Sequence, residues 1–436
     1  MLIFVGVTKS RMEYRRRIAD QLLKEQLDAM GAVLVEGPKA CGKTTTAEQI
    51  AGSVLYMADP RTYQANLQMV DTDITVLLKG KTPRLIDEWQ VAPQFWDAIR
   101  FAVDHRREVG QFILTGSAVP VSTQDIVHSG TGRFGWVTMR PMSLWESGDS
   151  TGEVSLGELF QSESQEVSGQ NHVDLEQLAF LICRGGWPSS LFAKTDKAAL
   201  LQAQNYLDAI VHADISRVDN VRRDSERVMR LMRCYARHQG TPSPISTLLK
   251  DLVNNDIPSL SDTTIADYLS ALRKIFVIED MKAWNPNLRS KSAIRTADNR
   301  YFVDSSVAVA ALDLGPADLM NDLNTMGLLF ETLCVRDLRV YADALQGTVY
   351  HFRDRNGLEC DAVVHLRNGA YGLVEIKLGG DRLIEEGAKN LCKLESLIDT
   401  TRMKAPSFKM ILVGVGPYAY RRTDGVLVVP VGCLKE

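Results

Sequence analysis

The sequence GPKACGKT at residues 37–44 restricts the folds open to this chain more than any other stretch. It fits the pattern G-x-x-x-x-G-K-[ST], it follows the apolar run AVLVEG at 32–37, and it precedes a helical pattern at 45–54. The two glycines let backbone N–H groups curl around an anion, and the N-terminus of the next helix favours negative charge. The pattern therefore predicts a strand–loop–helix unit with a phosphate site at the end of the strand.

The side chains of this loop have separate expected tasks. Lys43 is expected to reach the β- and γ-phosphates of a nucleotide, and the Thr44 hydroxyl to bind Mg²⁺. The alternative is a chance match in a glycine-containing loop, which the strand before it and the helix after it disfavour. The expected cofactor-binding residues are Gly37, Pro38, Lys39, Ala40, Cys41, Gly42, Lys43, Thr44, Thr45 and Thr115.

Two adjacent acids end the apolar run RLIDE at 84–88. Asp87 is expected to hold the metal shell of a bound nucleotide, and Glu88 to be the catalytic group that polarises the attacking water. The alternative is a pair of surface acids at a strand end. Because metal-assisted phosphoryl transfer needs such a partner beside the phosphate loop, the pattern favours the catalytic interpretation.

Hydroxyl groups end a further strand pattern, QFILTGSA at 111–118. Thr115 and Ser117 fall at the carboxyl end of that strand, where ligands gather in parallel sheets. They are expected either to sense the γ-phosphate or to cap the next helix.

Two arginines in the stretch SGTGRFGWVTMRPMSLWE at 129–146 are candidates for stabilising charge. Arg133 or Arg140 is expected to meet the γ-phosphate of its own site or of a neighbour's site, where it would stabilise the transition state. Action on a neighbour's site would require a homo-oligomer. The alternative is an arginine paired with Glu146 in a structural turn.

Strand-like runs alternate with helical patterns in the first third of the chain, which predicts a parallel sheet flanked by helices. Residues 147–172 are rich in Ser, Gly and Glu and are expected to form a long loop or linker. The predicted strands are 32–37, 53–59, 74–78, 84–88 and 111–118, with a helix at 91–107.

Residues 224–285 have the segment lengths of a helix–turn–helix unit, with Ser261 or Asp262 as the N-cap of the later helix. In a winged helix that later helix would enter a major groove of DNA. The alternative is a unit that packs between domains or against a protein partner, because the helix itself is not notably basic. Positive charge nearby comes from Arg289, Lys291, Arg295 and Arg300.

The stretch LVEIKLGG at 373–380 places Glu375 and Lys377 on one face of a predicted strand, because side chains alternate along a strand. An Asn-Gly turn folds the preceding strand back, which brings Asp361 near both charges. Asp361 and Glu375 would bind one or two Mg²⁺, Lys377 would stabilise developing charge, and Glu331 could be a further acid ligand of a phosphodiesterase. The alternatives are a cross-strand ion-pair cluster, and a domain that binds nucleic acid or protein without cutting.

Composition limits the class of protein. A net charge of -4 and a pI near 6.0 give no global attraction to nucleic acid, so a polyanion site must be a local patch. The seven cysteines are scattered without a CxxC, so neither a disulfide framework nor a zinc site is indicated. A cytoplasmic protein without a membrane partner is expected, because no long uninterrupted apolar run and no signal-like start occur.

The motifs GPKACGKT, LIDEWQ, LTGSA and TGRFGWVTMRPMSLWE together resemble a bacterial and archaeal group of AAA-type P-loop ATPases. GGWP, YFVDSSVA, and ECDAVV with VEIK fit the same group, so the resemblance covers nearly the whole chain. Such proteins carry a C-terminal domain of unknown function, number 4143, with a restriction-endonuclease-like core. The resemblance implies binding and hydrolysis of ATP. Cys41 and Cys360 stand where other residues are more usual.

The resemblance implies an α/β fold in four parts. A P-loop AAA-type parallel-sheet domain is expected at 1–150, a linker and helical connector at 151–223, a winged-helix-like segment at 224–300, and a restriction-endonuclease-like α/β domain at 301–436. Three functions stay open: an ATPase that acts on DNA, an ATP-dependent switch that holds a protein partner, and a nucleotide-gated scaffold with negligible turnover.

Overall fold

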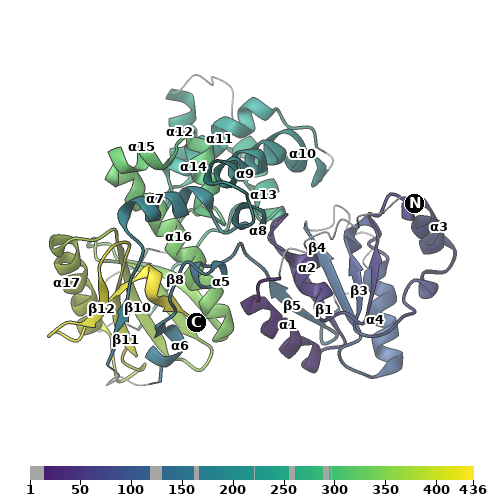
Figure 1. The fold of residues 1–436 in the computed structure, drawn as a ribbon, viewed down its shortest axis with the longest axis horizontal. Coiled ribbons are helices and arrows are strands. Elements are labelled where there is room, and N and C mark those ends of the chain that lie inside the picture. Colours follow the sequence, from purple (N-terminus) through teal and green to yellow (C-terminus); the bar gives the residue numbers. More distant parts are fainter. Residues whose placement is uncertain are drawn as a thin grey trace, which may run out of the picture.

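The computed structural model describes residues 14–117, 130–161, 166–219, 221–254, 261–287, 294–295 and 297–436. Figure 1 shows the N-terminal and C-terminal sheets on opposite sides of the molecule, with a group of helices from the middle of the chain between and above them. This mixed architecture confirms the predicted α/β class, with a parallel N-terminal sheet, a helical middle and a C-terminal sheet domain.

A parallel sheet of five strands carries the glycine-rich loop at the carboxyl end of β1. The strand order is β2-β3-β4-β1-β5, and all neighbours are parallel. Almost every residue of β1 and β4 is buried, because helices cover both faces of the sheet. The strands are β1 (Ala32–Glu36), β2 (Ser53–Tyr56), β3 (Arg84–Asp87), β4 (Phe112–Gly116) and β5 (Phe134–Thr138).

Helices cover the two faces of this sheet with separate cores. Leu23 of the first helix shares one core with Val33, and Trp96 of the fourth shares the other core with Leu34. Because successive residues of β1 point to opposite faces, this one strand contributes to both cores. The helices are α1 (Ile18–Ala29), α2 (Lys43–Glu48), α3 (Tyr63–Asp73) and α4 (Phe95–Arg106).

The strand predicted at 74–78 is wrong. Residues Ile74–Val76 form a short 3₁₀ helix, whose N-cap Asp73 accepts a hydrogen bond from the backbone of Thr75. That local side-chain bond competes with strand pairing, and β-branched residues alone do not overcome it. The sheet instead includes Phe134–Thr138, which lies within the arginine-containing stretch.

The middle helices pack around α14. This helix contacts α7, α9 and α11, and its sequence SSVAVAAL is apolar on nearly all sides, as expected for a surrounded helix. Residues 305–312 therefore pack with the middle of the chain, although they were expected in the C-terminal part. The helices are α7 (Leu175–Arg184), α8 (Pro188–Leu191), α9 (Asp196–Ala209), α10 (Ile215–Arg217), α11 (Ser225–Arg237), α12 (Ile245–Asn254), α13 (Asp262–Lys274), α14 (Ser305–Leu312) and α15 (Pro316–Asn321).

The helix–turn–helix segment comprises α11, α12 and α13. Ser261 is the N-cap of α13, where its hydroxyl accepts a hydrogen bond from the backbone of Thr264. Two antiparallel bridges, Ile278 with Phe302 and Met281 with Asn299, follow the three helices. A winged helix stays a prediction for this segment.

The C-terminal sheet has seven strands in the order β7-β12-β13-β11-β10-β9-β8. Strands β8, β9 and β10 form an antiparallel meander, and α17 then crosses to β11, which lies parallel to β10. The described part of the chain contains no helix that is both long and apolar enough to cross a membrane. The elements are α16 (Leu323–Ala344), β8 (Gly347–Arg353), β9 (Glu359–Leu366), β10 (Tyr371–Lys377), α17 (Asp381–Leu397), β11 (Phe408–Val413), β12 (Tyr418–Arg421) and β13 (Leu427–Pro430).

The segment 147–172, predicted as a long loop or linker, instead completes the C-terminal part. β7 (Gly169–Gln170) pairs with β12, and β6 (Val154–Ser155) pairs with β14 (Leu434–Lys435). The prediction rested on the scarcity of large apolar residues, but three of those that occur here, Val154, Leu156 and Leu159, are buried. The short helices α5 (Leu144–Ser147) and α6 (Leu156–Leu159) flank β6.

Arg140 joins the N-terminal sheet domain to both other parts. Its guanidinium lies 2.7 Å from Glu279, in the segment after α13, and 2.5 Å from Asp343 of α16. Burial alone would raise the pKa of Glu279, but the charges of Arg140 and Arg339 and a hydrogen bond outweigh it and lower that pKa to about 2. The ionised carboxylate therefore stabilises this junction.

The Glu279 carboxylate gives a pH-dependent contribution to stability. Its pKa in the unfolded chain is near the ordinary value and lies above the folded value, so its contribution is fully present above that ordinary value and is lost as the pH falls toward 2. We expect Glu279→Gln to destabilise the protein at neutral pH by about 1–3 kcal/mol, because Arg140 loses a charged partner. The difference from wild type should shrink at acidic pH, as measured by urea unfolding at several pH values.

The control for this prediction is Glu386→Gln. Glu386 pairs with Arg382 on an exposed helix surface, so its replacement should change stability by less than about 0.5 kcal/mol. A Glu279→Gln penalty that is independent of pH would contradict the role given to this carboxylate.

Candidate functional site

The glycine-rich loop packs tightly against the end of β5. Gly37 has φ +149°, and a Cβ built on it would lie 2.0 Å from the carbonyl oxygen of Met139. Gly42 has φ +104°, a conformation that side chains rarely adopt. The side chain of Cys41 is buried with its Sγ 3.6 Å from the same Met139 oxygen, so it faces the protein interior.

The ammonium group of Lys43 lies inside the loop. It donates hydrogen bonds to the carbonyl oxygens of Gly37 at 2.9 Å and Pro38 at 2.7 Å, and the residue is only 6% exposed. When the loop binds a phosphate, the ammonium group would exchange these neutral carbonyl oxygens for a charged phosphate oxygen, which forms the stronger hydrogen bond. The position therefore suits the predicted contact with phosphate.

Three polar side chains from separate elements meet beside the loop. The hydroxyl groups of Thr44 and Thr115 both donate to Oδ1 of Asp87, at 2.7 and 2.8 Å. β3 and β4 are parallel neighbours, so their carboxyl ends place Asp87 and Thr115 side by side. This set of hard oxygen donors fits Mg²⁺, which prefers such ligands.

Glu88 follows Asp87 with an unusual backbone conformation. Its φ of +56° lies in the left-handed region, which is costly for a residue that is not glycine. Its carboxylate accepts hydrogen bonds from the side-chain amide of Gln90 and, at 3.4 Å, from Ser117. Gln90 lies in the same motif, but an amide there carries no chemical signature alone, so this residue could not be identified from the sequence.

The guanidinium groups of both candidate arginines are paired with carboxylates, although Arg140 lines a cavity together with Pro38 of the loop. Arg133 precedes β5 and so lies at the amino ends of the parallel strands, away from the loop, and it pairs with Asp104 at 2.8 Å. Arg140 is engaged at the junction described above. Glu146 pairs with neither arginine, because Arg17 at the start of α1 takes that position at 3.0 Å.

Arg17 and Lys39 connect the loop to its surroundings. Arg17 donates to the carbonyl oxygen of Cys41 at 2.9 Å and to that of Arg140 at 2.8 Å. Lys39 pairs at 2.6 Å with Asp214, which ends a π-helical turn in the middle part. Arg140 and Asp214 each lie more than one hundred residues from their partner in the sequence, so no local pattern could have predicted these two contacts.

A second cluster of charged groups lies at the end of β10. Lys377 Nζ lies 2.6 Å from Glu375 and 3.0 Å from Asp361 on the adjoining strand, and Asp361 also accepts the backbone N–H of Ile376 at 2.7 Å. Glu375 is 1% exposed, and its Oε1 accepts no hydrogen bond from any residue that the structure describes. The expected proximity of these three charges is therefore present.

The carboxylates of this cluster disfavour one another's ionised forms. Burial and the charge of Asp361 raise the pKa of Glu375 well above its ordinary value. Burial, with the same charge adding, raises the pKa of Glu331 to about 8. Glu331, which accepts a hydrogen bond from Tyr301, lines a cavity of about 520 Å³ together with Lys377. Close, desolvated carboxylates with an unsatisfied oxygen fit a divalent cation.

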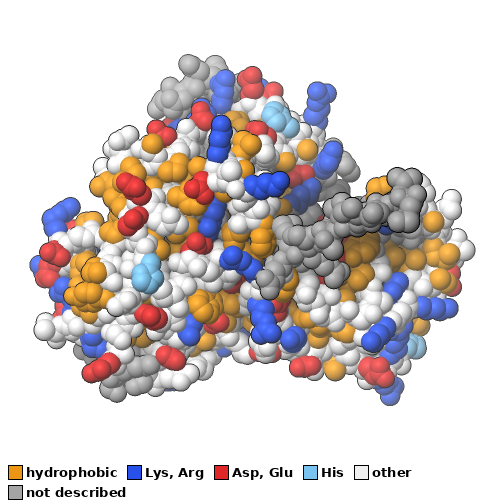
Figure 2. Space-filling model, in the orientation of Figure 1, with side chains coloured by type: hydrophobic (Ala, Val, Ile, Leu, Met, Phe, Trp, Pro, Cys, Tyr) orange, Lys and Arg blue, Asp and Glu red, His pale blue; other side chains and the backbone are white. Residues whose placement is uncertain are grey.

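One of the four basic residues predicted near the helix–turn–helix part is paired within the protein. Arg300 pairs with Asp280 at 2.9 Å and donates a hydrogen bond to the backbone carbonyl of Ser243, so its charge is neutralised within the protein. Arg295 is described, but Arg289 and Lys291 lie outside the described residues. On the face drawn in Figure 2, basic and acidic side chains are interspersed.

Three family models match separate parts of the chain. Residues 30–147 match an AAA domain, residues 175–318 match a domain of unknown function numbered 8612, and residues 326–434 match the domain of unknown function numbered 4143. The first segment contains the glycine-rich loop, Asp87 and Glu88. It is an AAA-type P-loop ATPase domain, and the protein is an ATP hydrolase.

Two curated relatives span almost the whole chain. Uncharacterised proteins of Mycobacterium bovis and Mycobacterium tuberculosis are each 22% identical over 425 residues, covering 97% of this chain and 85% of theirs. Among solved structures, a Walker-type ATPase of Pyrococcus abyssi has a TM-score of 0.42 at 14% identity, covering 69% of this chain and 99% of that one. An Aeropyrum pernix ORC1 protein in complex with DNA has a TM-score of 0.25 at 12% identity, covering 70% and 92%.

The close approach at Gly37 predicts how the loop responds to substitution. We expect Gly37→Ala to lower nucleotide affinity about tenfold or more, because the Met139 carbonyl must move and reshape the loop. The matched control is Gly357→Ala, which also has positive φ but no neighbouring atom within 4 Å. The control should cost about 1–2 kcal/mol of stability from strain and leave affinity unchanged, as checked by titration with a fluorescent nucleotide. Equal affinity in both variants would contradict the packing argument.

Proposed function

We propose that ATP hydrolysis at the glycine-rich loop depends on Glu88 as the general base and is coupled to the middle and C-terminal parts of the chain. The observation that carries this proposal is the convergence of Thr44, Asp87 and Thr115 through two hydrogen bonds directly beside Glu88. Lys43 and Thr44 would bind the nucleotide phosphates and Mg²⁺, and Asp87 would hold the metal shell. When bound, Mg²⁺ would supply charge stabilisation for the transferring phosphoryl group.

Glu88 would take the proton of the attacking water as its oxygen bonds to the γ-phosphorus and the bond to ADP breaks. The hydrogen bonds from Gln90 and Ser117 hold the carboxylate in place for this step. The ammonium of Lys43 would move from the loop carbonyls to the phosphate oxygens and stabilise their charge. The strained backbone of Glu88 is the kind of conformation that functional sites retain.

The loop contacts supply the proposed coupling. Phosphate binding would compete with Asp214 for Lys39 and so loosen one contact with the middle helices. Arg17 meanwhile links the loop backbone to Arg140, whose side chain bonds the other two parts. An action of Arg133 on a neighbouring copy would require a homo-oligomer and stays a prediction.

Substitutions at the loop and at Glu88 test this proposal. We expect Lys43→Ala to abolish nucleotide binding, and Glu88→Gln to retain binding while lowering kcat about 100- to 10,000-fold. ATP turnover of the purified full-length chain is measured with and without duplex or single-stranded DNA, with Lys43→Ala as the blank. Full turnover in Glu88→Gln would remove Glu88 as the base. Stimulation by DNA would identify nucleic acid as the target, and indifference to DNA would favour a switch for a protein partner.

A second candidate function is metal-dependent cleavage of a phosphodiester by the C-terminal cluster. The observation that favours it is the buried, unpartnered Oε1 of Glu375 beside Asp361 and Lys377. Asp361, Glu375 and Glu331 would hold Mg²⁺, while Lys377 would stabilise charge on the phosphate. The alternative is a catalytically inactive domain of the same fold, in which Lys377 neutralises two carboxylates and the cavity holds a partner.

Cleavage is tested by nicking of supercoiled DNA with Mg²⁺ or Mn²⁺. We expect wild type to nick and Asp361→Asn to lose nicking, because the change removes a charged ligand while the acceptor for the backbone N–H of Ile376 is kept. Glu386→Gln, an exposed carboxylate on α17, is the control and should nick as wild type does. Equal nicking by all three proteins would identify a contaminating nuclease and exclude this function.

A further inference from the structure

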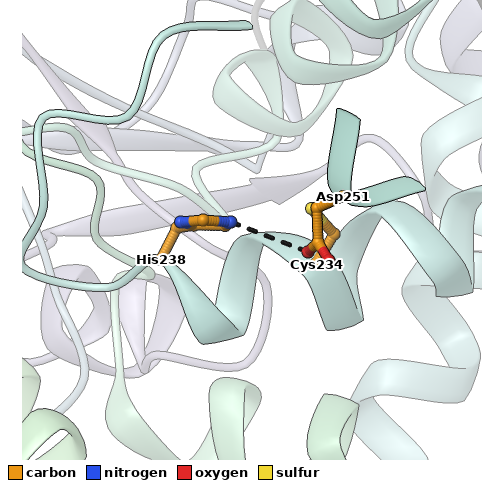
Figure 3. A group of neighbouring side chains, drawn as sticks. All are labelled: Cys234, His238 and Asp251. Carbon is orange, nitrogen blue, oxygen red and sulfur yellow. Dashed lines mark ion pairs between the residues drawn. The ribbon is translucent and has the colours of Figure 1, made fainter. Parts of the chain in front are cut away.

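A sulfur, a nitrogen and an oxygen ligand atom converge between α11 and α12. Cys234 and His238 lie four residues apart, which puts their side chains on one face of the end of α11, and Asp251 faces them from α12. Their ligand atoms all lie within 4.8 Å of one another. Figure 3 shows the imidazole directed at the other two side chains, with its ion pair to Asp251 marked.

We propose that Cys234, His238 and Asp251 form a binding site for a zinc-like divalent cation that joins α11 to α12. The separation of His238 Nε2 and Asp251 Oδ2 is already 3.6 Å. Tetrahedral ligands at ordinary zinc bond lengths are about 3.5 Å apart, so these two ligand atoms already have the required spacing. The mixture of sulfur, nitrogen and oxygen suits zinc better than Mg²⁺, which prefers oxygen ligands alone.

The surroundings orient these ligands as a metal site requires. The other ring nitrogen of His238, Nδ1, lies 3.1 Å from the hydroxyl of Ser243, which directs Nε2 toward the cluster. Arg237 holds Asp251 at 2.6 Å. The Arg237 side chain is 40% exposed, so its pair with Asp251 is weak and leaves the carboxylate able to bind a cation.

The site also has a path for entry. The side chains of His238 and Asp251 are about one-fifth to one-quarter exposed, whereas Cys234 is fully buried at the inner end. Solvent could occupy a fourth position on the outer side. Binding of the thiolate would release the thiol proton to solvent, so metal uptake should be accompanied by about one proton. The scattered cysteines of the sequence gave no sign of such a site, because the third ligand comes from another helix.

Cobalt is the probe that distinguishes this site from oxygen-ligand sites elsewhere in the chain. The full-length protein is stripped with a chelator and titrated with Co²⁺ in excess Mg²⁺, which occupies the carboxylate and nucleotide sites. We expect a thiolate-to-cobalt charge-transfer band that saturates near one equivalent and disappears on addition of Zn²⁺. Absence of the band would overturn the proposal.

Variants of the cluster complete the test. Cys234→Ser should lose the band, and His238→Gln and Asp251→Asn should weaken cobalt binding at least about tenfold. His212→Gln and Cys392→Ser, from outside the cluster, should bind as wild type does. Persistence of the band in Cys234→Ser, or an equal loss in Cys392→Ser, would overturn the assignment.

Thermal unfolding supplies a second readout. Zn²⁺ should raise the Tm of wild type and not that of His238→Gln, whose changed side chain is partly exposed and lies at a helix end. Equal shifts in the two proteins would overturn the proposal, because the cation would then bind elsewhere.

Discussion

The buried guanidinium of Arg17 is the contact on which the phosphate loop and its neighbours depend. Arg17 is 6% exposed, and its guanidinium donates hydrogen bonds to three acceptors: the carbonyl oxygens of Cys41 and Arg140, and the carboxylate of Glu146. A buried cation needs such partners, since an isolated charge in the interior is very costly. Glu146 also caps α5. The Arg17 side chain therefore helps to position the loop, the segment that follows β5 and, through Glu146, the start of α5.

Ion pairs of Arg140 and of Lys39 connect the loop region to the later parts of the chain. They differ in solvent exposure, and this difference gives them different roles. Arg140 is 10% exposed and meets two carboxylates, so water screens this junction little. Lys39 is 46% exposed in its pair with Asp214, so that contact is weak and easily exchanged. A nucleotide-dependent change would therefore act through Lys39, while Arg140 keeps the three parts together.

Much of the N-terminal sheet and its loop could be predicted because the signal is local. The motif at residues 37–44 requires a strand before it and a helix after it. The parallel pairing of β3 with β4 then places Asp87 beside Thr115. The strand at 74–78 was predicted wrongly because a single Asp73 cap favours a turn. The segment at 147–172 was misread because its partners, β12 and β14, lie in the last twenty residues or so of the chain. The roles given to Asp361 and Glu375 stay predictions, although the strand pairing brings them together.

The pairing of β7 with β12 has a consequence for synthesis on the ribosome. Gln170 pairs with Tyr418, so β7 cannot pair with β12 until 248 further residues have been made. At about 5–20 residues per second, this interval lasts roughly 12–50 seconds. All strands of the AAA domain lie within residues 32–138, so they have been made before this interval begins. The C-terminal sheet, whose strands β12 and β13 are made after this interval, is therefore completed later.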